Sequence, residues 1–417
     1  MSSAPPRLVV ETRETAPVED LLLSADPAAP LVWQRRGDGF AGRGVVVAFE
    51  RQDALVGHRL SPGEAWRRVA ADARVDDAVR LPGTGLVAFG SAPFDPSSTA
   101  PARLTVPRTI VGRSGGRGWV TRIRREDEDW PAPPRACAYG PHWSAALGPG
   151  AQSPAGYQDA VRDVLAAIAA GEASKVVMAR DLTGRAPADA DLRRLVRALA
   201  SDYPDTWAFA IDGLIGASPE TLVTVRGGTV TARVLAGTAA RGADPDADVA
   251  ASLALITSTK DQDEHRFAVR SVLAALAPHA RALAAGETPY TLKLPNVWHL
   301  ATDVEGELAD TASALDLAVA LHPTAAVAGT PTAAAMEVIR RLEPFDRERY
   351  AGPVGWIDAA GDGEWAIALR CAQFGDATGG VRPLTAYAGA GIVAGSDPES
   401  ELLETRVKFR PIVDALA

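Results

Sequence analysis

A run of small residues followed by an acidic run, together residues 387–408, carries the densest set of groups able to do chemistry. We expect a strand that ends at Ala388 and then a turn. Residues without bulky side chains leave the backbone N–H groups of such a turn open to an anionic group. The residues of the expected turn are Gly389, Ala390 and Gly391.

A helix is predicted to begin directly after this turn. Ser396 or Asp397 can cap it, and Pro398 suits its first turn. One face of this helix then carries Glu401, Glu404 and Lys408. Two carboxylates and an ammonium group beside the turn could hold a divalent metal ion together with an anionic ligand. A plain Glu404–Lys408 ion pair on a solvated helix has the same spacing, and this segment alone leaves both interpretations open.

Lys175 and Glu220 are charged residues that stand among apolar ones. Alternation in the strand predicted over 175–180 places Lys175 on the side of Val177 and Ala179, although a lysine extending to solvent from a strand edge gives the same pattern. Glu220 follows Pro219, and burial there could raise the pKa of its carboxyl and make it a proton donor. Most glutamates beside a turn are simply solvated.

Carboxylates are also dense where Ser258 opens a helix predicted over 258–278. Its first turns contain Asp261, Asp263 and Glu264. The helix dipole alone would explain acids at that end. The two cysteines and the six histidines offer no CxxC, HExxH or paired-histidine spacing, which excludes the usual zinc sites. Oxygen-ligated Mg²⁺ is therefore the natural ion, and its ligands or their support would be Glu264, Glu401 and Glu404.

Before about residue 130, glycine and proline residues separate short apolar runs. This pattern predicts short strands, a hairpin turn over 115–118 and a helix over 61–72. The strands are predicted over 45–49, 86–89, 104–111 and 119–123. A connector rich in proline and glycine follows over 130–150.

Apolar periodicity is clearer from residue 153 onward. It predicts helices over 153–171, 189–202, 258–278, 315–321 and 332–342, and strands over 175–180, 207–211, 214–225, 230–235 and 296–302. The last of these strands carries His299, and the small-residue loop predicted over 236–242 carries Thr238. A hairpin over 350–357 and 363–374 would present Arg370 from its second strand.

Composition excludes several partner classes. The chain has 417 residues, 47% of them hydrophobic and 23% charged, which is ordinary for a globular protein. A formal net charge of −9, with no basic run beyond 122–125, argues against nucleic acid and anionic membranes. The N-terminus lacks the apolar core of a signal peptide, and no apolar run reaches the roughly 18 residues of a spanning helix. We therefore expect a cytoplasmic protein.

Seven motifs in a fixed order resemble those of the chorismate-utilising enzymes. They are KVVMAR from Lys175, ASPETL from Ala217, LAGT from Leu235, KDQDEH from Lys260, VWHL from Val297, GEW through Arg370-Cys-Ala, and GAGI through Glu404-Thr-Arg-Val-Lys408. Within this family the chain is most similar to the isochorismate synthases. The match runs over residues 153–417, and residues 88–95 resemble the N-terminal element of the family.

This resemblance implies one α+β domain over residues 1–417. The chorismate-binding fold has two layers of mostly antiparallel sheet with flanking helices, and the active site lies between the layers. Residues 1–150 would form the less typical N-terminal half and residues 153–417 the motif-bearing catalytic half.

The resemblance also implies a role for each candidate. Lys175 would be the base that activates water, and Glu220 the acid that protonates the departing 4-hydroxyl, so that water enters ring C2 and isochorismate forms. Mg²⁺ would be bound by Glu264 and Glu404 with Glu401 close by. Chorismate would be held by Thr238, His299, Tyr350, Arg370, Gly389, Ala390, Gly391 and Lys408.

Three positions separate the branches of the family. Lys175 stands where ammonia-using relatives typically have Gln, and Ala236 where some of them have a nucleophilic Lys, so water is the expected nucleophile and no glutaminase subunit is implied. Ala326 stands where salicylate synthases resemble one another in having Thr, which favours isochorismate over salicylate as the end product. Salicylate synthase and a non-catalytic chorismate-binding subunit remain the alternatives. We expect a monomer, and both siderophore and menaquinone biosynthesis remain open as pathways.

Overall fold

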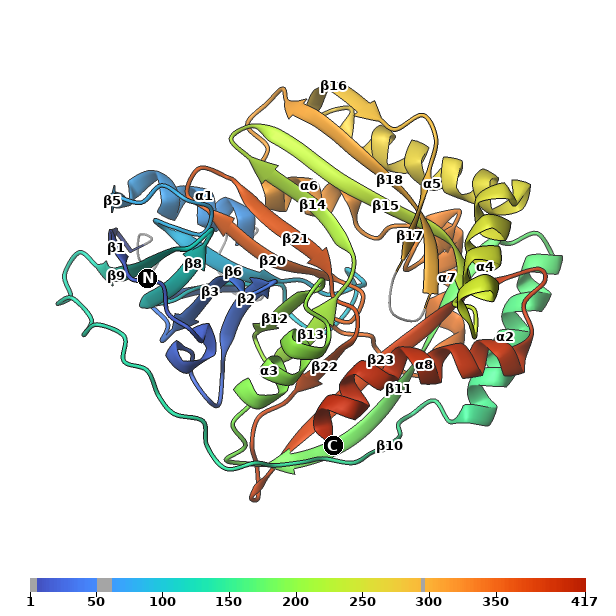
Figure 1. The fold of residues 1–417 in the computed structure, drawn as a ribbon, viewed down its shortest axis with the longest axis horizontal. Helices are drawn as coiled ribbons and strands as arrows, with labels where there is room; N and C mark the ends of the chain where they lie inside the picture. The colour runs from blue at the N-terminus through green and yellow to red at the C-terminus, as the bar shows by residue number, and fades with distance from the viewer. Residues whose placement is uncertain (1–5, 51–61, 294–296) are drawn as a thin grey trace.

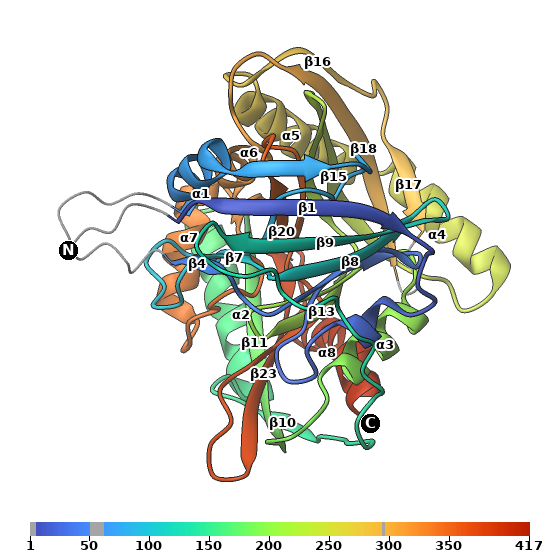
Figure 2. The same cartoon turned by 90° about the vertical axis from the view of Figure 1, so that its left-hand side faces the viewer.

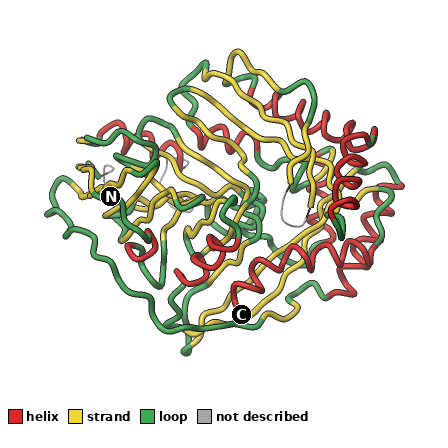
Figure 3. Tube along the Cα trace, viewed as in Figure 1, coloured by secondary structure: helices red, strands yellow, loops and turns green. Residues whose placement is uncertain are grey.

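The structure, a computed structural model, describes residues 6–50, 62–293 and 297–417 (Figure 1). The strands of this part of the chain form two large sheets, and both sheets contain strands from before and after residue 150. Every strand pair in the described residues is antiparallel except β1 with β5. The expected α+β fold of two mostly antiparallel layers with flanking helices is confirmed (Figure 3).

The larger sheet runs across the whole molecule. Its strands, in spatial order, are β10 (Leu147–Pro149), β11 (Lys175–Pro187), β23 (Val381–Val393), β22 (Cys371–Phe374), β13 (Leu214–Ser218), β12 (Trp207–Ile211), β2 (Leu31–Arg35), β3 (Asp38–Arg43), β8 (Thr109–Ser114), β9 (Arg117–Arg125), β1 (Leu8–Thr15) and β5 (Arg74–Asp77), with β19 (Gly329–Thr330) beside β11. Figure 2 shows β1, β9 and β8 side by side at one end of this sheet.

The smaller sheet faces the larger one. Its order is β16 (Ala280–Ala285), β18 (Val297–Leu308), β15 (Thr229–Ala240), β14 (Thr221–Arg226), β21 (Gly363–Ile367), β20 (Pro353–Asp358), β6 (Val87–Ser91), β7 (Arg103–Val106) and β4 (Val47–Glu50), with β17 (Tyr290–Lys293) beside β18. Part of the core lies between the sheets, where Phe40 of β3 contacts Phe89 of β6 and meets Trp356 of β20 edge-on.

Helices pack on both sheets. They are α1 (Pro62–Asp72), α2 (Pro154–Ala169), α3 (Arg193–Asp202), α4 (Pro245–Thr257), α5 (Thr259–Leu276), α6 (Ala314–Leu321), α7 (Thr332–Leu342) and α8 (Pro398–Leu416), with a 3-10 helix, η1, over Leu21–Ser24. Helix α8 packs on β23 and helix α5 on β15. Among the helices of the described residues, none combines the length and apolarity needed to span a membrane.

The helix predictions from residue 153 onward are confirmed in position. Ser153 caps α2 by accepting a hydrogen bond from the Gly156 N–H, and Gly171 follows its end in the left-handed conformation. Ser258 caps α5 and Asp397 caps α8. Helix α4 and strands β1, β2 and β3 were not predicted. Ser61 and Asn296, at the starts of two predicted elements, lie outside the described residues.

Three predicted strands are wrong because the chain passes from one sheet to the other within them. The run 104–111 splits at Pro107, and the run 214–225 splits at Pro219 and Glu220, since proline cannot donate to a strand ladder. The second hairpin strand, 363–374, splits into β21 and β22, and Arg370 lies between them with a left-handed φ of 49°.

The predicted turn at Gly389 and Gly391 is also wrong, because β23 continues to Val393. Its residues pair with β11 along the whole length of that strand, so Gly389 lies opposite Ala179 and Gly391 opposite Val177. Likewise, the expected loop after 235 is part of β15, which continues to Ala240 with an irregularity at Gly237. In both segments, pairing with a distant strand overrides the low strand propensity of small residues.

Gly389 should be intolerant of a side chain although its backbone is extended. A Cβ atom there would lie 2.6 Å from the Met178 carbonyl oxygen, a contact that only a backbone shift could relieve. We expect Gly389→Ala to lower the free energy of unfolding by about 1–3 kcal/mol, measured by urea denaturation. Gly395→Ala is the matched control, since its Cβ would meet nothing within 4 Å. Equal stability of the two variants would contradict the close packing of β11 and β23.

Candidate active site

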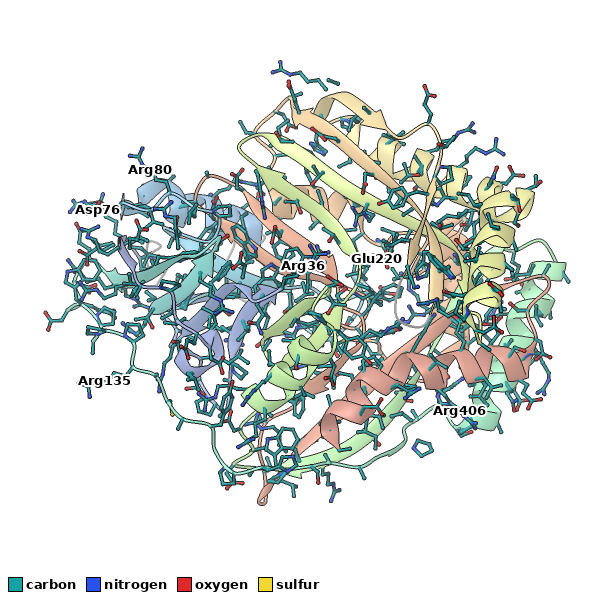
Figure 4. The ribbon with its side chains drawn as sticks, viewed as in Figure 1. Arg36, Asp76, Arg80, Arg135, Glu220 and Arg406 are labelled. Carbon is teal, nitrogen blue, oxygen red and sulfur yellow. The ribbon has the colours of Figure 1, made fainter. Side chains whose placement is uncertain are left out.

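A cavity of about 300 Å³ lies where the chain passes between the two sheets. Most of the predicted site residues line it: Lys175, Glu220, Glu264, His299, Tyr350, Arg370, Gly389, Gly391, Glu401, Glu404 and Lys408. Figure 4 shows Glu220 near the middle of the molecule, whereas Arg80 and Arg135 project from its periphery. The cavity therefore brings together residues that are more than 200 positions apart in the chain.

Lys175 is the first residue of β11, and its ammonium group faces α5. Its Nζ lies 2.6 Å from Oε1 of Glu264, which stands in the second turn of that helix. Gly391, on the neighbouring strand, makes room for this side chain, because a Cβ at Gly391 would lie 3.0 Å from the Lys175 Cε. The lysine thus points into the cavity and not out to solvent from a strand edge.

Glu220 lies in the chain crossing between β13 and β14. Its backbone carbonyl accepts a hydrogen bond from the Ile367 N–H, and its N–H donates to the Ser218 hydroxyl. Burial raises the pKa of its carboxyl to about 7, although the charges of Lys175, Arg370 and Lys408 act in the opposite direction. The raised pKa favours the protonated carboxyl near neutral pH, as a proton donor requires.

Residues on the acidic face of α8 line the cavity, and two of them form an ion pair. Lys408 Nζ lies 2.6 Å from Oε1 of Glu404 and also donates to the Gly389 carbonyl oxygen at 2.8 Å. Burial lowers the pKa of Lys408, while the Glu404 charge opposes that shift. Burial raises the pKa of Glu401, and the nearby Glu404 charge adds to the effect. The Glu404–Lys408 ion pair is thus present, but it lies at the cavity wall and not on a solvated helix face.

Arg370 is a cation enclosed at the wall of the cavity. Among the residues that the structure describes, its guanidinium forms no ion pair, and burial lowers its pKa. An arginine remains protonated in proteins even so. A buried charge that lacks a counter-ion is costly, so the position suits an anionic ligand that enters the cavity.

The backbone N–H groups of Gly389 and Gly391 are directed away from β11. Opposite them, the Ala179 N–H donates to Glu343 and the Val177 N–H to the Ala328 carbonyl, so neither pairs with β23. In an antiparallel ladder, both groups of such a non-hydrogen-bonded pair point outward. The amides thus lie along a strand edge and not in the predicted turn. Ala390 is a correction, because its side chain is buried in the core and does not line the cavity.

His299 and Tyr350 form further parts of the wall. Burial lowers the pKa of His299 to about 4, helped by the charges of Lys408 and Arg370, so its imidazole is neutral near pH 7. Tyr350 is buried and stacks on Tyr387 with ring centroids 5.3 Å apart, and burial raises its pKa. The backbone of Thr238 pairs with His299, but the Thr238 side chain lies outside the described part of the structure.

Arg347 and Glu343 were missed by the sequence analysis. They form a fully buried ion pair at 2.5 Å, and Arg347 also lines the cavity. Arg347 donates to the Val177 carbonyl, while Glu343 accepts from the Ala179 N–H. The pair therefore holds the free edge of β11 next to Lys175. In the sequence, the only sign of this ion pair is that two opposite charges stand four residues apart just after the end of α7.

The carboxylates of the cavity suit a magnesium ion. Among the described residues, no three acidic, histidine or cysteine side chains form a ready cluster for a metal. Mg²⁺ commonly takes only one or two carboxylates and completes its octahedron with water and substrate oxygens. Glu264, Glu401 and Glu404 all border the cavity, and the charges of Glu401 and Glu404 act on each other. This donor set fits such a partly substrate-ligated ion.

Comparisons with known proteins agree on one family. Residues 142–417 match the family model described as chorismate binding enzyme. The isochorismate synthase DhbC of Bacillus subtilis is 43% identical over 63% of this chain and 68% of its own length. The putative isochorismate synthase MenF of Mycobacterium tuberculosis is 39% identical over 83% of this chain and 90% of its own. The solved structure of MenF, the menaquinone-specific isochorismate synthase from Escherichia coli, is 26% identical and superposes with a TM-score of 0.78, covering 98% of this chain and 95% of that one.

The protonated state of Glu220 should be visible in the stability of the protein. Its pKa of about 7 lies above the ordinary value of 4.5, so the folded state holds the proton more tightly than the unfolded state. This contribution is fully present below about pH 4.5 and is lost as the pH rises through about 7. We expect Glu220→Gln to become more stable than the wild type by up to about 3 kcal/mol above that pH.

Urea denaturation at several pH values measures this difference, with the exposed Glu287→Gln as the control. A stability difference between Glu220→Gln and the wild type that stays constant with pH would show that Glu220 keeps an ordinary pKa.

Proposed function

This chain belongs to the chorismate-binding enzyme family, and from that premise we propose that it is a magnesium-dependent isochorismate synthase, an isomerase. One observation carries the proposal. A lysine and a carboxyl group with a pKa of about 7 line the same cavity as a guanidinium group that has no ion-pair partner among the described residues. Base, acid and anion-binding group are the three parts that the exchange of a ring hydroxyl requires.

Chorismate is a dianion, and the cavity offers cations and amides to match it. Arg370 would bind one carboxylate directly, since it has no ion pair to give up among the described residues. Lys408 and the outward N–H groups of Gly389 and Gly391 would bind a second carboxylate. Neutral His299 and buried Tyr350 would border the ring.

Lys175 would accept the proton of the attacking water. In the structure its Nζ is paired with the Glu264 carboxylate. The pair must open before Lys175 can act as a base, because only the neutral amine accepts a proton.

Glu220 would donate its proton to the C4 hydroxyl as that group leaves. Water then forms a bond to C2 while the C4–oxygen bond breaks, and the ring double bonds shift between these positions. The atoms balance, since one water enters and one leaves. A pKa of about 7 keeps enough of the acid protonated at neutral pH for this step.

Glu264 and Glu404 would hold Mg²⁺, with Glu401 supporting them. When bound, the ion supplies positive charge to a carboxylate of the substrate and to the acidic side chains around it. We further propose that the enzyme acts in the cytoplasm as a monomer. Cys137 and Cys371 form no disulfide, as is usual in a reducing compartment.

Two alternatives have distinct products. A salicylate synthase would go on to eliminate pyruvate, but Ala326 at the cavity wall lacks the hydroxyl expected in that branch. A non-catalytic chorismate-binding subunit would give no product, and it would have little need for an acid, a base and metal ligands together. Chromatography of the products formed from chorismate separates the three possibilities.

Lys175→Ala should remove the base without closing the anion-binding part of the cavity. We expect kcat to fall about 10²- to 10⁴-fold, while the Kd of chorismate changes little. Turnover is measured by chromatography and binding by calorimetry. Lys293→Ala, on an exposed lysine, is the matched control. Unimpaired turnover by Lys175→Ala would rule out the assignment of this residue as the base.

Removal of the metal should stop the reaction reversibly. We expect EDTA to abolish isochorismate formation and added Mg²⁺ to restore it. Glu401→Gln should raise the Mg²⁺ concentration needed for half-maximal rate about 10- to 100-fold, because it removes a charge beside the ion. Calorimetric titration with Mg²⁺ gives the same affinity independently of turnover. Full activity in EDTA would refute the magnesium requirement.

A further inference from the structure

A second cavity, of about 240 Å³, adjoins the candidate active site behind Glu220. Glu220, Leu235 and Ala326 line both cavities. The remaining walls come from α5, from β14, β15 and β21, from the end of α6 with residues 322–326, and from the start of α7. None of the roles assigned above uses this second cavity, which we call the rear cavity.

His322 and Thr324 are two polar residues in the wall of the rear cavity. His322 Nε2 lies 2.8 Å from the Phe94 carbonyl oxygen, and burial lowers the pKa of this imidazole to about 4. A neutral imidazole that donates from Nε2 presents Nδ1 as an acceptor. Among the described residues, His322 Nδ1 and Thr324 Oγ1 are both buried and have no partner.

Water is the ligand that suits the polar part of this wall. The hydroxyl groups of Thr221, Ser271 and Thr332 also belong to residues that line the rear cavity. Buried polar groups are normally satisfied by protein atoms or ordered water. A volume of about 240 Å³ holds several waters, since each takes about 30 Å³ in the liquid.

The rear cavity also leads from the interior to the surface. Glu220 lies at its inner end, where burial is the main cause of the raised pKa of its carboxyl. Ser271 of α5 lines the same cavity and is exposed to solvent. A file of waters between these two residues would connect the buried acid to the surrounding solution.

The reaction needs such a connection, and this step rests on the proposed function. Each turnover leaves Glu220 as a carboxylate and Lys175 as an ammonium group, and it releases one water where the C4 hydroxyl departs. Glu220 must then regain one proton while Lys175 loses one. We propose that the rear cavity is a water-filled path through which Glu220 recovers its proton and the released water leaves.

Blocking the path tests the proposal without requiring turnover. Ala268→Leu places a larger side chain in the rear cavity, and Thr324→Val removes a hydroxyl with little change of shape. Ala274→Leu is the matched control, because Ala274 is exposed on the same helix and does not line the rear cavity. Thr324→Val keeps the test available if Ala268→Leu disturbs folding, which circular dichroism would reveal.

The measurement is the rate at which the Glu220 carboxyl exchanges its proton for deuterium. Infrared spectra at about pH 6 follow its C=O band, which the Glu220→Gln difference spectrum identifies. We expect Ala268→Leu to slow exchange about tenfold, an added barrier of about 1.4 kcal/mol, and to lower kcat without raising KM. Thr324→Val should slow exchange less, and Ala274→Leu should match the wild type.

Exchange at the wild-type rate in both rear-cavity variants would overturn the proposal. A wild-type protein that forms no isochorismate would instead overturn the proposed function, and the exchange rates would still decide whether the rear cavity serves Glu220. The two proposals therefore fail separately.

Discussion

The site depends on one constraint: two neighbouring stretches of chain leave one sheet and enter the other side by side. Residues 219–220 connect β13 to β14, and residues 368–370 connect β21 to β22, while β13 pairs with β22 and β14 with β21. Backbone hydrogen bonds join the two crossings, from Ile367 to Glu220 and from Ala217 to Arg370. Glu220 and Arg370 are thereby fixed relative to each other. Neither lies in a strand ladder, so both side chains are free to face the cavity.

The electrostatics of the cavity follow from that placement. A crossing between two sheets is enclosed by both, so charged groups there lose much of their hydration. Burial raises the pKa of Glu220 and lowers that of His299. Arg370 forms no ion pair among the described residues. Such an arrangement reduces stability in the empty protein, because each charge would be better solvated in the unfolded chain. The proposed entry of a dianionic substrate together with a cation would offset this cost.

The sequence predicted local features better than strand partners. The helix α8 and its acidic face follow from capping residues and spacing, and Lys175 was correctly placed at the start of a strand. The crossing at Glu220 was missed because β13 and β14 form one continuous apolar run, although Pro219 marks the break. The run of glycines after Ala388 indicated a turn, but its pairing partner lies about 210 residues away, and only the three-dimensional structure reveals that partner. Local pattern determines whether a segment can be a strand, and distant partners determine where that strand ends.

The buried Arg347–Glu343 pair shows why the surroundings of Lys175 could not be predicted from the sequence of β11 alone. Lys175 is held from both sides of β11. On one side β23 pairs with the strand and supplies Gly391, which leaves space for the lysine. On the other side β19 pairs with its first two residues, and the ion pair takes the Val177 carbonyl and the Ala179 N–H. Arg347 also donates to the Val327 carbonyl, beside Ala326 in the cavity wall. Arg347 thus ties the strand of Lys175 to the wall that both cavities share, so the geometry at Lys175 and the cavity behind Glu220 depend on the same support.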